Sequence, residues 1–219
     1  VAFEHAGVKN RVGGFAQPRR VVADTSTLAT LPARQLSNGL AEVVKYGLIE
    51  DFSLFELLEN QTEAALAGES ELLEELVYRS IAIKARVVAE DERDFGVRQL
   101  LNFGHTFAHG LEAALDYSGL LHGEAVGLGM LMASTYAELE GTGPAGLADR
   151  LAALLRKLRL PTEVTGLSRQ AILGKMAKDK KRLGSELKLV LPTGLGQSEV
   201  RIGADPGLLE KVLDRYLPE

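Results

Sequence analysis

The 219-residue sequence predicts a mainly α-helical protein with one small β-hairpin and, at its start, a short piece of an α/β unit. Over 37–181, apolar residues recur at helical spacing in segments separated by Gly, Pro or polar residues. Further on, two apolar segments, 187–192 and 198–203, are joined by TGLGQ, which is typical of a hairpin. We therefore divide the chain into an α/β part, 1–36, and a helical domain, 37–219.

The elements follow in order along the chain. Residues 1–20 are rich in Gly and polar residues and predict a loop, and 21–24 (VVAD) predicts a short strand. Ser37 and Asn38 are candidate N-caps of the first helix. The predicted helices cover 37–49, 52–67, 69–94, 99–116, 122–140, 145–158, 168–181 and 206–217. The last helix begins after Asp205, a capping residue followed by proline.

Composition limits the possible functions. The net charge is −5 and there is no basic block, which argues against nucleic acid as the main partner. The chain has no cysteine, so a transition-metal site has to use histidine and carboxylate ligands. No apolar run reaches the roughly 18 residues of a membrane span, and no signal peptide is visible. We expect a cytoplasmic protein, and because the chain begins at Val1 in a predicted loop, a piece of a longer one.

The segment NFGHTFAHGLE, residues 102–112, carries a polar stripe without lysine. On a helical wheel its two histidines, an amide and a carboxylate fall within a sector of roughly 80°. These residues are Asn102, His105, His109 and Glu112, and Arg98 joins them if the helix begins early enough. Either this is a half-exposed helix whose histidines make single hydrogen bonds, or the stripe holds a ligand.

A third histidine, His122, begins the next predicted helix, where Gly127 and Gly129 allow close packing. The connection of about five residues makes the two helices neighbours, so His122 could turn back towards the stripe. Catalytic zinc usually has three protein ligands, and the H-E-x-x-H motif is absent. A further ligand therefore has to come from elsewhere. Glu42, in the apolar run GLAEVVKYG, is a candidate, and the alternative is a surface ion pair with Lys45.

Basic residues stand out at two other places. Lys84 has Val and Ile residues at helical spacing around it, so it either extends its ammonium group to solvent or binds an anion. Lys180 and Lys181, in AKDKKRLG, form a cluster that is also compatible with a solvated helix end.

The chain resembles the dehydroquinate synthase family of sugar-phosphate cyclases in four segments, whose order and spacing are specific: GLAEVVKYGLI, IKARVVAEDERDFGVRQLLNFGHTFAHGLEAAL, LHGEAVGLGM and DKKRLGSELKLVLPTGLGQ. The resemblance runs from about residue 9 to residue 200. It implies an enzyme with an N-terminal α/β domain that binds NAD and a helical C-terminal domain that binds a metal. On this basis, 1–36 is a remnant of the NAD-binding domain and 37–219 is the metal- and substrate-binding domain.

The resemblance also implies roles for individual residues. The ligands of Zn²⁺ or Co²⁺ would be Glu42, His105 and His122. The residues that bind the phosphorylated sugar-acid substrate or move protons would be Lys45, Lys84, Arg98, Asn102, His109, Lys180 and Lys181, with the choice between the last two left open. The residues near NAD would be Lys9, Asn10, Thr27, Thr30 and Leu31. Glu112 receives no role this way, and we expect it to bind the imidazole of a metal ligand.

The implied reaction converts 3-deoxy-arabino-heptulosonate 7-phosphate to 3-dehydroquinate and phosphate, through oxidation by NAD, phosphate elimination, reduction and an aldol closure. The residue types suit it, because a bound metal acidifies a hydroxyl and Lys and Arg match phosphate and carboxylate. His109 is suited to relay protons, and the family suggests a homodimer. The Gly-rich NAD sequence of the family is absent from these 219 residues, so we expect this chain to be inactive alone.

Three alternatives remain. The chain could belong to another sugar-phosphate cyclase that makes an aminated quinate or an inosose. It could belong to a metal-dependent polyol dehydrogenase of related fold, although such enzymes typically use Asp and a different histidine spacing. It could also be a non-enzymatic helical domain that serves in dimerisation.

Overall fold

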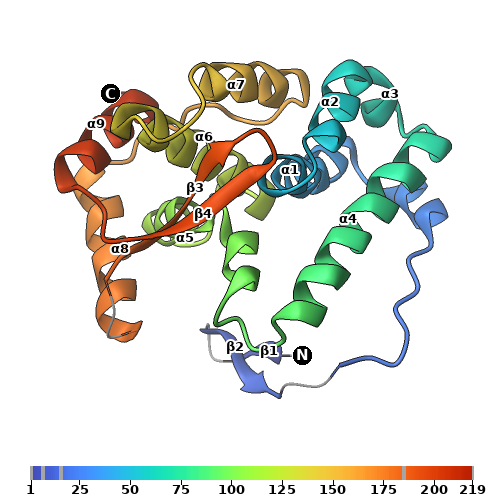
Figure 1. Ribbon diagram of the computed structural model, residues 1–219, viewed down its shortest axis with the longest axis horizontal. Coiled ribbons are helices and arrows are strands. Elements are labelled where there is room, and N and C mark those ends of the chain that lie inside the picture. The colour runs from blue at the N-terminus through green and yellow to red at the C-terminus, as the bar shows by residue number, and fades with distance from the viewer. Residues whose placement is uncertain (1, 6–7, 15–16, 184–185, 219) are drawn as a thin grey trace.

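The computed structural model describes residues 2–5, 8–14, 17–183 and 186–218, and for 2–5, 8–11 and 178–183 the backbone alone. This part of the chain is mainly helical, as predicted, with two separate antiparallel strand pairs (Figure 1). The helices are η1 (Thr25–Thr30), α1 (Ala33–Ile49), α2 (Phe52–Asn60), α3 (Thr62–Ala67), α4 (Ser70–Glu90), η2 (Val97–Asn102), α5 (His105–Ala114), α6 (His122–Glu140), α7 (Leu147–Lys157), α8 (Arg169–Leu183) and α9 (Pro206–Tyr216), where η denotes a 3-10 helix. The strands are β1 (Ala2–His5), β2 (Val8–Gly13), β3 (Lys188–Gly194) and β4 (Gln197–Ile202).

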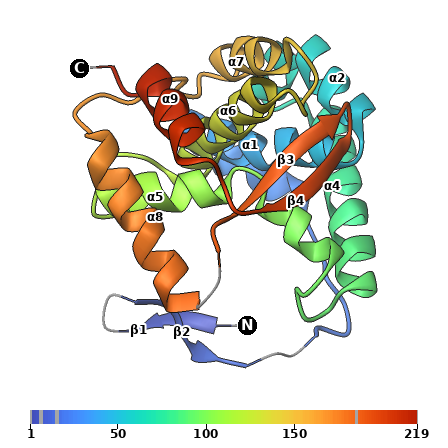
Figure 2. The same ribbon diagram turned by 60° about the vertical axis from the view of Figure 1, so that its left-hand side comes forward.

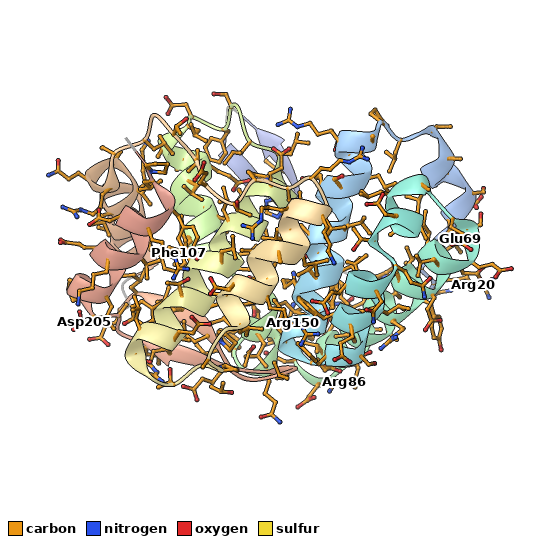
Figure 3. The ribbon with its side chains drawn as sticks, turned by 90° about the horizontal axis from the view of Figure 1, so that it is seen from above. Arg20, Glu69, Arg86, Phe107, Arg150 and Asp205 are labelled. Carbon is orange, nitrogen blue, oxygen red and sulfur yellow. The ribbon has the colours of Figure 1, made fainter. Side chains whose placement is uncertain are left out.

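Helix α6 is the centre of the core. It is buried continuously from Gly123 to Ala137, and it packs against α1, α5, α7, α9 and β3. A helix that is covered on all sides needs no polar face, which explains why most of its residues from Gly123 to Ala137 are apolar or small. Phe107 of α5 is 1% exposed and belongs to the same core. Seen from above, Phe107 lies inside the molecule, whereas Arg20 and Glu69 lie at one edge and Asp205 at the opposite edge (Figure 3).

Close backbone contact between α5 and α6 depends on glycine, as the sequence predicts for Gly129. A Cβ atom at Gly129 would lie 2.0 Å from the carbonyl oxygen of Gly104. Gly104 itself has a φ of 79°, in the left-handed region, and precedes the first residue of α5. The single helix predicted over 99–116 is therefore wrong, because η2 ends at Asn102 and Gly104 reverses the backbone before α5 begins.

The start of the chain differs from the prediction. Residues 1–20, predicted as a loop, contain the antiparallel strands β1 and β2. They lie at the opposite end of the molecule from α7 in both side views (Figures 1 and 2). The strand predicted at 21–24 does not form. Within the described residues, no strand pairs with this segment, and Val21 and Val22 are 70% and 80% exposed. A strand needs such a partner for its backbone hydrogen bonds, so an apolar run alone does not make one.

Three helix boundaries also differ. Helix α1 begins at Ala33 after Pro32, so Ser37 and Asn38 lie inside it and are not its N-caps. The helix predicted over 52–67 is divided into α2 and α3 at Gln61. Helix α4 ends at Glu90 rather than 94, because the carboxylate of Asp91 accepts the N–H groups of residues 95, 96 and 98 and holds a turn there.

The C-terminal elements confirm the sequence analysis. Strands β3 and β4 pair in antiparallel register, with Val190 opposite Val200. The carboxylate of Asp205 accepts the N–H of Leu208 and caps α9. Within the described residues, none of the helices combines the length and the hydropathy that crossing a membrane requires. The division of the chain at 36/37 stays a prediction.

Candidate metal centre

Three helices bring Glu42, His105 and His122 together. Glu42 lies in the middle of α1, and the two histidines are the first residues of α5 and α6. The Oε1 atom of Glu42 lies 3.7 Å from Nε2 of His105 and 3.8 Å from Nε2 of His122. One ligand atom from each of the three residues lies within 4.8 Å of the others. Two imidazoles and a carboxylate at these separations fit a tetrahedral Zn²⁺ or Co²⁺ site with one open position.

Hydrogen bonds determine which imidazole nitrogen faces the centre. Nδ1 of His105 lies 3.1 Å from the carbonyl oxygen of Phe103, and Nδ1 of His122 lies 3.0 Å from Oε1 of Glu112. A carbonyl and a carboxylate only accept hydrogen bonds, so each Nδ1 carries the proton and each Nε2 offers a lone pair. The contact confirms that Glu112 binds an imidazole, and the role of that imidazole as a metal ligand stays a prediction.

The charge states of these groups favour a cation. Burial, together with the ammonium group of Lys45, lowers the pKa of His105 to about 4, so the ring is neutral near pH 7. Burial acts to raise the pKa of Glu42, but Lys45 and the two histidines outweigh it and keep the pKa below its usual value. The centre therefore presents the carboxylate of Glu42 and the neutral imidazole of His105 to a cation.

Lys45 is a buried partner of Glu42. Its side chain is 5% exposed, and Nζ donates to Oε2 of Glu42 at 2.5 Å, which leaves Oε1 facing the histidines. The alternative of a surface ion pair is therefore wrong. Burial lowers the pKa of Lys45, against the opposing effect of Glu42.

Two other predicted residues lie beside the centre. The ring of His109 is exposed on α5, and its centroid lies 5.8 Å from that of His105. Lys84 is exposed on α4 and lines a cavity of about 270 Å³ between α4 and α1. Glu42 lines the same cavity, together with Gly39, Val43, Tyr46, Val77, Ser80 and Ile81. Lys84 is thus placed to meet a molecule that approaches Glu42.

The roles of the remaining predicted residues stay predictions. Arg98 donates from Nη1 to the carbonyl oxygen of Glu92 at 2.7 Å, and Asn102 is exposed at the end of η2. The three predicted NAD contacts Thr27, Thr30 and Leu31 are exposed in and beside η1, which packs against α4. The side chains of Lys9, Asn10, Lys180 and Lys181 lie outside the described residues.

The sequence analysis missed one set of residues next to His122. Arg34 and Asn38 of α1 and Glu124 of α6 form hydrogen bonds around the start of α6. The one sequence signal for them was the acidic residue at the third position of the helix, where the side chain of a capping box binds backbone N–H groups.

Sequence comparison places the chain beside known proteins. Residues 39–182 match the sequence profile described as "3-dehydroquinate synthase C-terminal", and residues 1–38 match "3-dehydroquinate synthase N-terminal". A 3-dehydroquinate synthase from Teredinibacter turnerae is 48% identical over 210 residues, which is 95% of this chain and 58% of that protein. The chain thus spans little more than half the length of this relative.

Solved structures show the same fold. A 2-epi-5-epi-valiolone synthase from Streptomyces hygroscopicus, with NAD⁺ and Zn²⁺ bound, is 27% identical with a TM-score of 0.87, over 97% of this chain and 59% of that one. A 2-deoxy-scyllo-inosose synthase in complex with carbaglucose-6-phosphate, NAD⁺ and Co²⁺ is 28% identical with a TM-score of 0.83, over 99% and 62% of the two chains.

Proposed function

The chain belongs to the 3-dehydroquinate synthase family, and we propose that it is the metal- and substrate-binding part of a 3-dehydroquinate synthase of the shikimate pathway. The observation that carries the proposal is the convergence of Glu42, His105 and His122 from three helices in a chain 48% identical to a relative of that name. The proposed reaction converts 3-deoxy-arabino-heptulosonate 7-phosphate to 3-dehydroquinate and phosphate.

The cofactors of this reaction would be NAD and Zn²⁺ or Co²⁺. When bound, the metal lowers the pKa of a coordinated hydroxyl, and NAD carries the hydride. Glu42, His105 and His122 would hold the metal, because Oε1 of Glu42 and the Nε2 atoms of the two histidines face one another. Lys45 neutralises the second oxygen of Glu42 and adds positive charge beside the substrate. Thr27, Thr30, Leu31, Lys9 and Asn10 are the proposed NAD contacts.

The substrate would occupy the space between α1, α4 and α5. Lys84 stands at the cavity beside Glu42 and would bind an anionic group of the substrate. His109, exposed next to His105, would move a proton to or from the substrate. Arg98, Asn102 and one of Lys180 and Lys181 complete the proposed set of substrate residues.

Sequence identity favours 3-dehydroquinate synthase over the other cyclases. The relative of that name is 48% identical, whereas the valiolone and inosose synthases are 27% and 28% identical. The metal ligand set of two histidines and a glutamate differs from the aspartate-containing set expected of polyol dehydrogenases. A purely structural helical domain would have no use for three ligand atoms within 4.8 Å of one another.

Titration calorimetry of the zinc-loaded chain tests the substrate assignment. We expect 3-deoxy-arabino-heptulosonate 7-phosphate to bind at least about tenfold more tightly than carbaglucose-6-phosphate. Each buried polar group of the site that the wrong ligand leaves without a hydrogen-bond partner costs about 1–3 kcal/mol. Lys84→Ala should weaken binding of the first ligand. A preference for carbaglucose-6-phosphate would assign the chain to an inosose-forming enzyme instead.

We also propose that the protein is a homodimer located in the cytoplasm. Sedimentation velocity of the purified chain would reveal the dimer as a species of twice the chain mass, and a monomer at all concentrations would exclude it for this chain.

A further inference from the structure

The start of α6 is held by a buried carboxylate. Glu124 is 6% exposed, and its Oε2 atom accepts the N–H of Leu121 at 2.8 Å. Arg34 of α1 binds the same carboxylate through two hydrogen bonds, from Nε to Oε1 at 2.7 Å and from Nη2 to Oε2 at 2.8 Å. Arg34 also donates to the carbonyl oxygen of Gly119 at 3.0 Å. The residue just before His122 is thereby tied to α1.

A second contact from α1 holds the residue just after His122. The Oδ1 atom of Asn38 accepts the N–H of Gly123 at 2.6 Å. The two backbones are also in close contact here, because a Cβ atom at Gly123 would lie 2.0 Å from the carbonyl oxygen of Asn38. The backbone is therefore bound by side chains on both sides of the histidine.

The three α1 residues involved share one face of the helix. Arg34, Asn38 and Glu42 are spaced four residues apart, and side chains at this spacing line one side of an α-helix. The same face of α1 that supplies the carboxylate ligand thus also binds the chain around His122. The connection from α5 to α6 is exposed over residues 116–119, so it contributes little burial of its own to fix the histidine.

We propose that Arg34, Asn38 and Glu124 are positioning residues that set the distance between His122 and Glu42 and so preassemble the metal centre. This inference rests on the proposed metal-binding function. We call the hydrogen bonds of Arg34, Asn38 and Glu124 around His122 the bridge. If the bridge is removed, the start of α6 can move relative to α1. The position of His122 then has to be fixed when the metal binds. Loss of a partner that orients a metal ligand typically weakens affinity about 10–100-fold.

Arg34 offers the most specific test, because a control of the same kind exists elsewhere. Arg150 of α7, labelled in Figure 3, binds Glu59 of α2 through two hydrogen bonds of 3.0 and 2.6 Å. In the described part of the chain, its partners do not include any of the three ligands. Arg34→Met and Arg150→Met each remove an arginine that binds a glutamate through two hydrogen bonds, and Arg150→Met also removes a 3.6 Å ion pair with Glu56. Only the first removes a pair that joins two ligand-bearing helices, α1 and α6.

Two measurements on the 219-residue chain decide the question. Competition with a chelator gives the affinity for Co²⁺, and amide hydrogen exchange without metal gives the protection of residues 119–124. We expect Arg34→Met to weaken Co²⁺ binding at least about tenfold and to speed exchange at 119–124. Arg34→Lys should recover part of both effects, and Arg150→Met should change neither by more than about twofold.

Unchanged Co²⁺ affinity in Arg34→Met, or equal losses in both methionine variants, would overturn the positioning role. Failure of the unmodified chain to bind Co²⁺ would instead contradict the proposed metal function. In that case the exchange data still decide whether the bridge orders the start of α6: faster exchange at 119–124 in Arg34→Met alone supports it, and unchanged exchange refutes it.

Discussion

The hydrogen bond between Glu112 and His122 makes a quantitative prediction about metal affinity. Oε1 of Glu112 lies 3.0 Å from Nδ1 of His122, and the Glu112 side chain is 7% exposed. Glu112→Gln retains the shape and a carbonyl acceptor but removes the charge. Because a hydrogen bond to a charged group contributes about 1 kcal/mol more than a neutral one, the affinity for Zn²⁺ should fall about fivefold.

Glu112→Ala removes the acceptor as well as the charge. The imidazole of His122 then loses the group that fixes its ring orientation and its Nδ1 proton. We expect Zn²⁺ affinity to fall about 10–100-fold, which corresponds to about 1.4–2.7 kcal/mol. The affinity for Zn²⁺ should be highest in the parent, lower in Glu112→Gln and lowest in Glu112→Ala.

The assay is competition between the purified chain and a chromogenic chelator for Zn²⁺ at pH 7.5, with far-UV circular dichroism to verify that each variant is folded. Thr106→Ala, in the first turn of α5, is the control, because its hydroxyl donates to the carbonyl oxygen of Lys188. A folded Glu112→Ala variant whose Zn²⁺ affinity stays within about twofold of the parent would refute the reasoning.

Two further predictions concern stability. Gly129→Ala should destabilise the fold by about 3 kcal/mol, because its Cβ would lie 2.0 Å from the carbonyl oxygen of Gly104. Gly127→Ala, whose Cβ would have its nearest atoms at 3.5 Å, should leave the stability unchanged or raise it by up to about 1 kcal/mol through helix propensity. Equal urea midpoints for the two variants would contradict this. The hydrogen bond from Arg150 lowers the pKa of Glu59, so the pair stabilises the fold above the unfolded-state pKa of about 4.3 and loses its effect as the pH falls through the lower folded-state value. The cost of Glu59→Gln in urea unfolding should therefore be up to about 1 kcal/mol at pH 7 and diminish towards pH 3, and a cost independent of pH would count against the ion pair.

Most of the helical architecture followed from periodicity, and the errors have physical causes. The stripe 102–112 was treated as one continuous helix, but Gly104 adopts a left-handed conformation, which sequence periodicity does not reveal. His105, His109 and Glu112 still share the same part of the molecule because all three lie on α5. Asn102 does not belong to that helix, and its predicted place in the stripe depended on the wrong boundary.

The residues alone predicted that a metal site would use histidine and carboxylate ligands. The choice of Glu42, His105 and His122 as the proposed ligands came from the family resemblance. The short connection between the two predicted helices indicated that His122 could approach the stripe, and the structure confirms it, with the rings of His105 and His122 5.3 Å apart. The bridge from Arg34 to Glu124 joins residues 90 positions apart, and no local pattern indicates such a pair. Glu112 was identified as a partner of an imidazole, although the sequence did not indicate which one.

The most direct test of the account is a zinc count in the unmodified chain beside the His105→Ala and His109→Ala variants. Each protein is loaded with Zn²⁺, dialysed and measured by atomic emission. Because Nε2 of His105 faces Glu42 whereas the exposed His109 lies outside the ligand group, we predict one zinc per chain in the parent and in His109→Ala, and little or none in His105→Ala. A full equivalent of zinc in His105→Ala, or its loss in His109→Ala, would contradict the assignment of the metal centre.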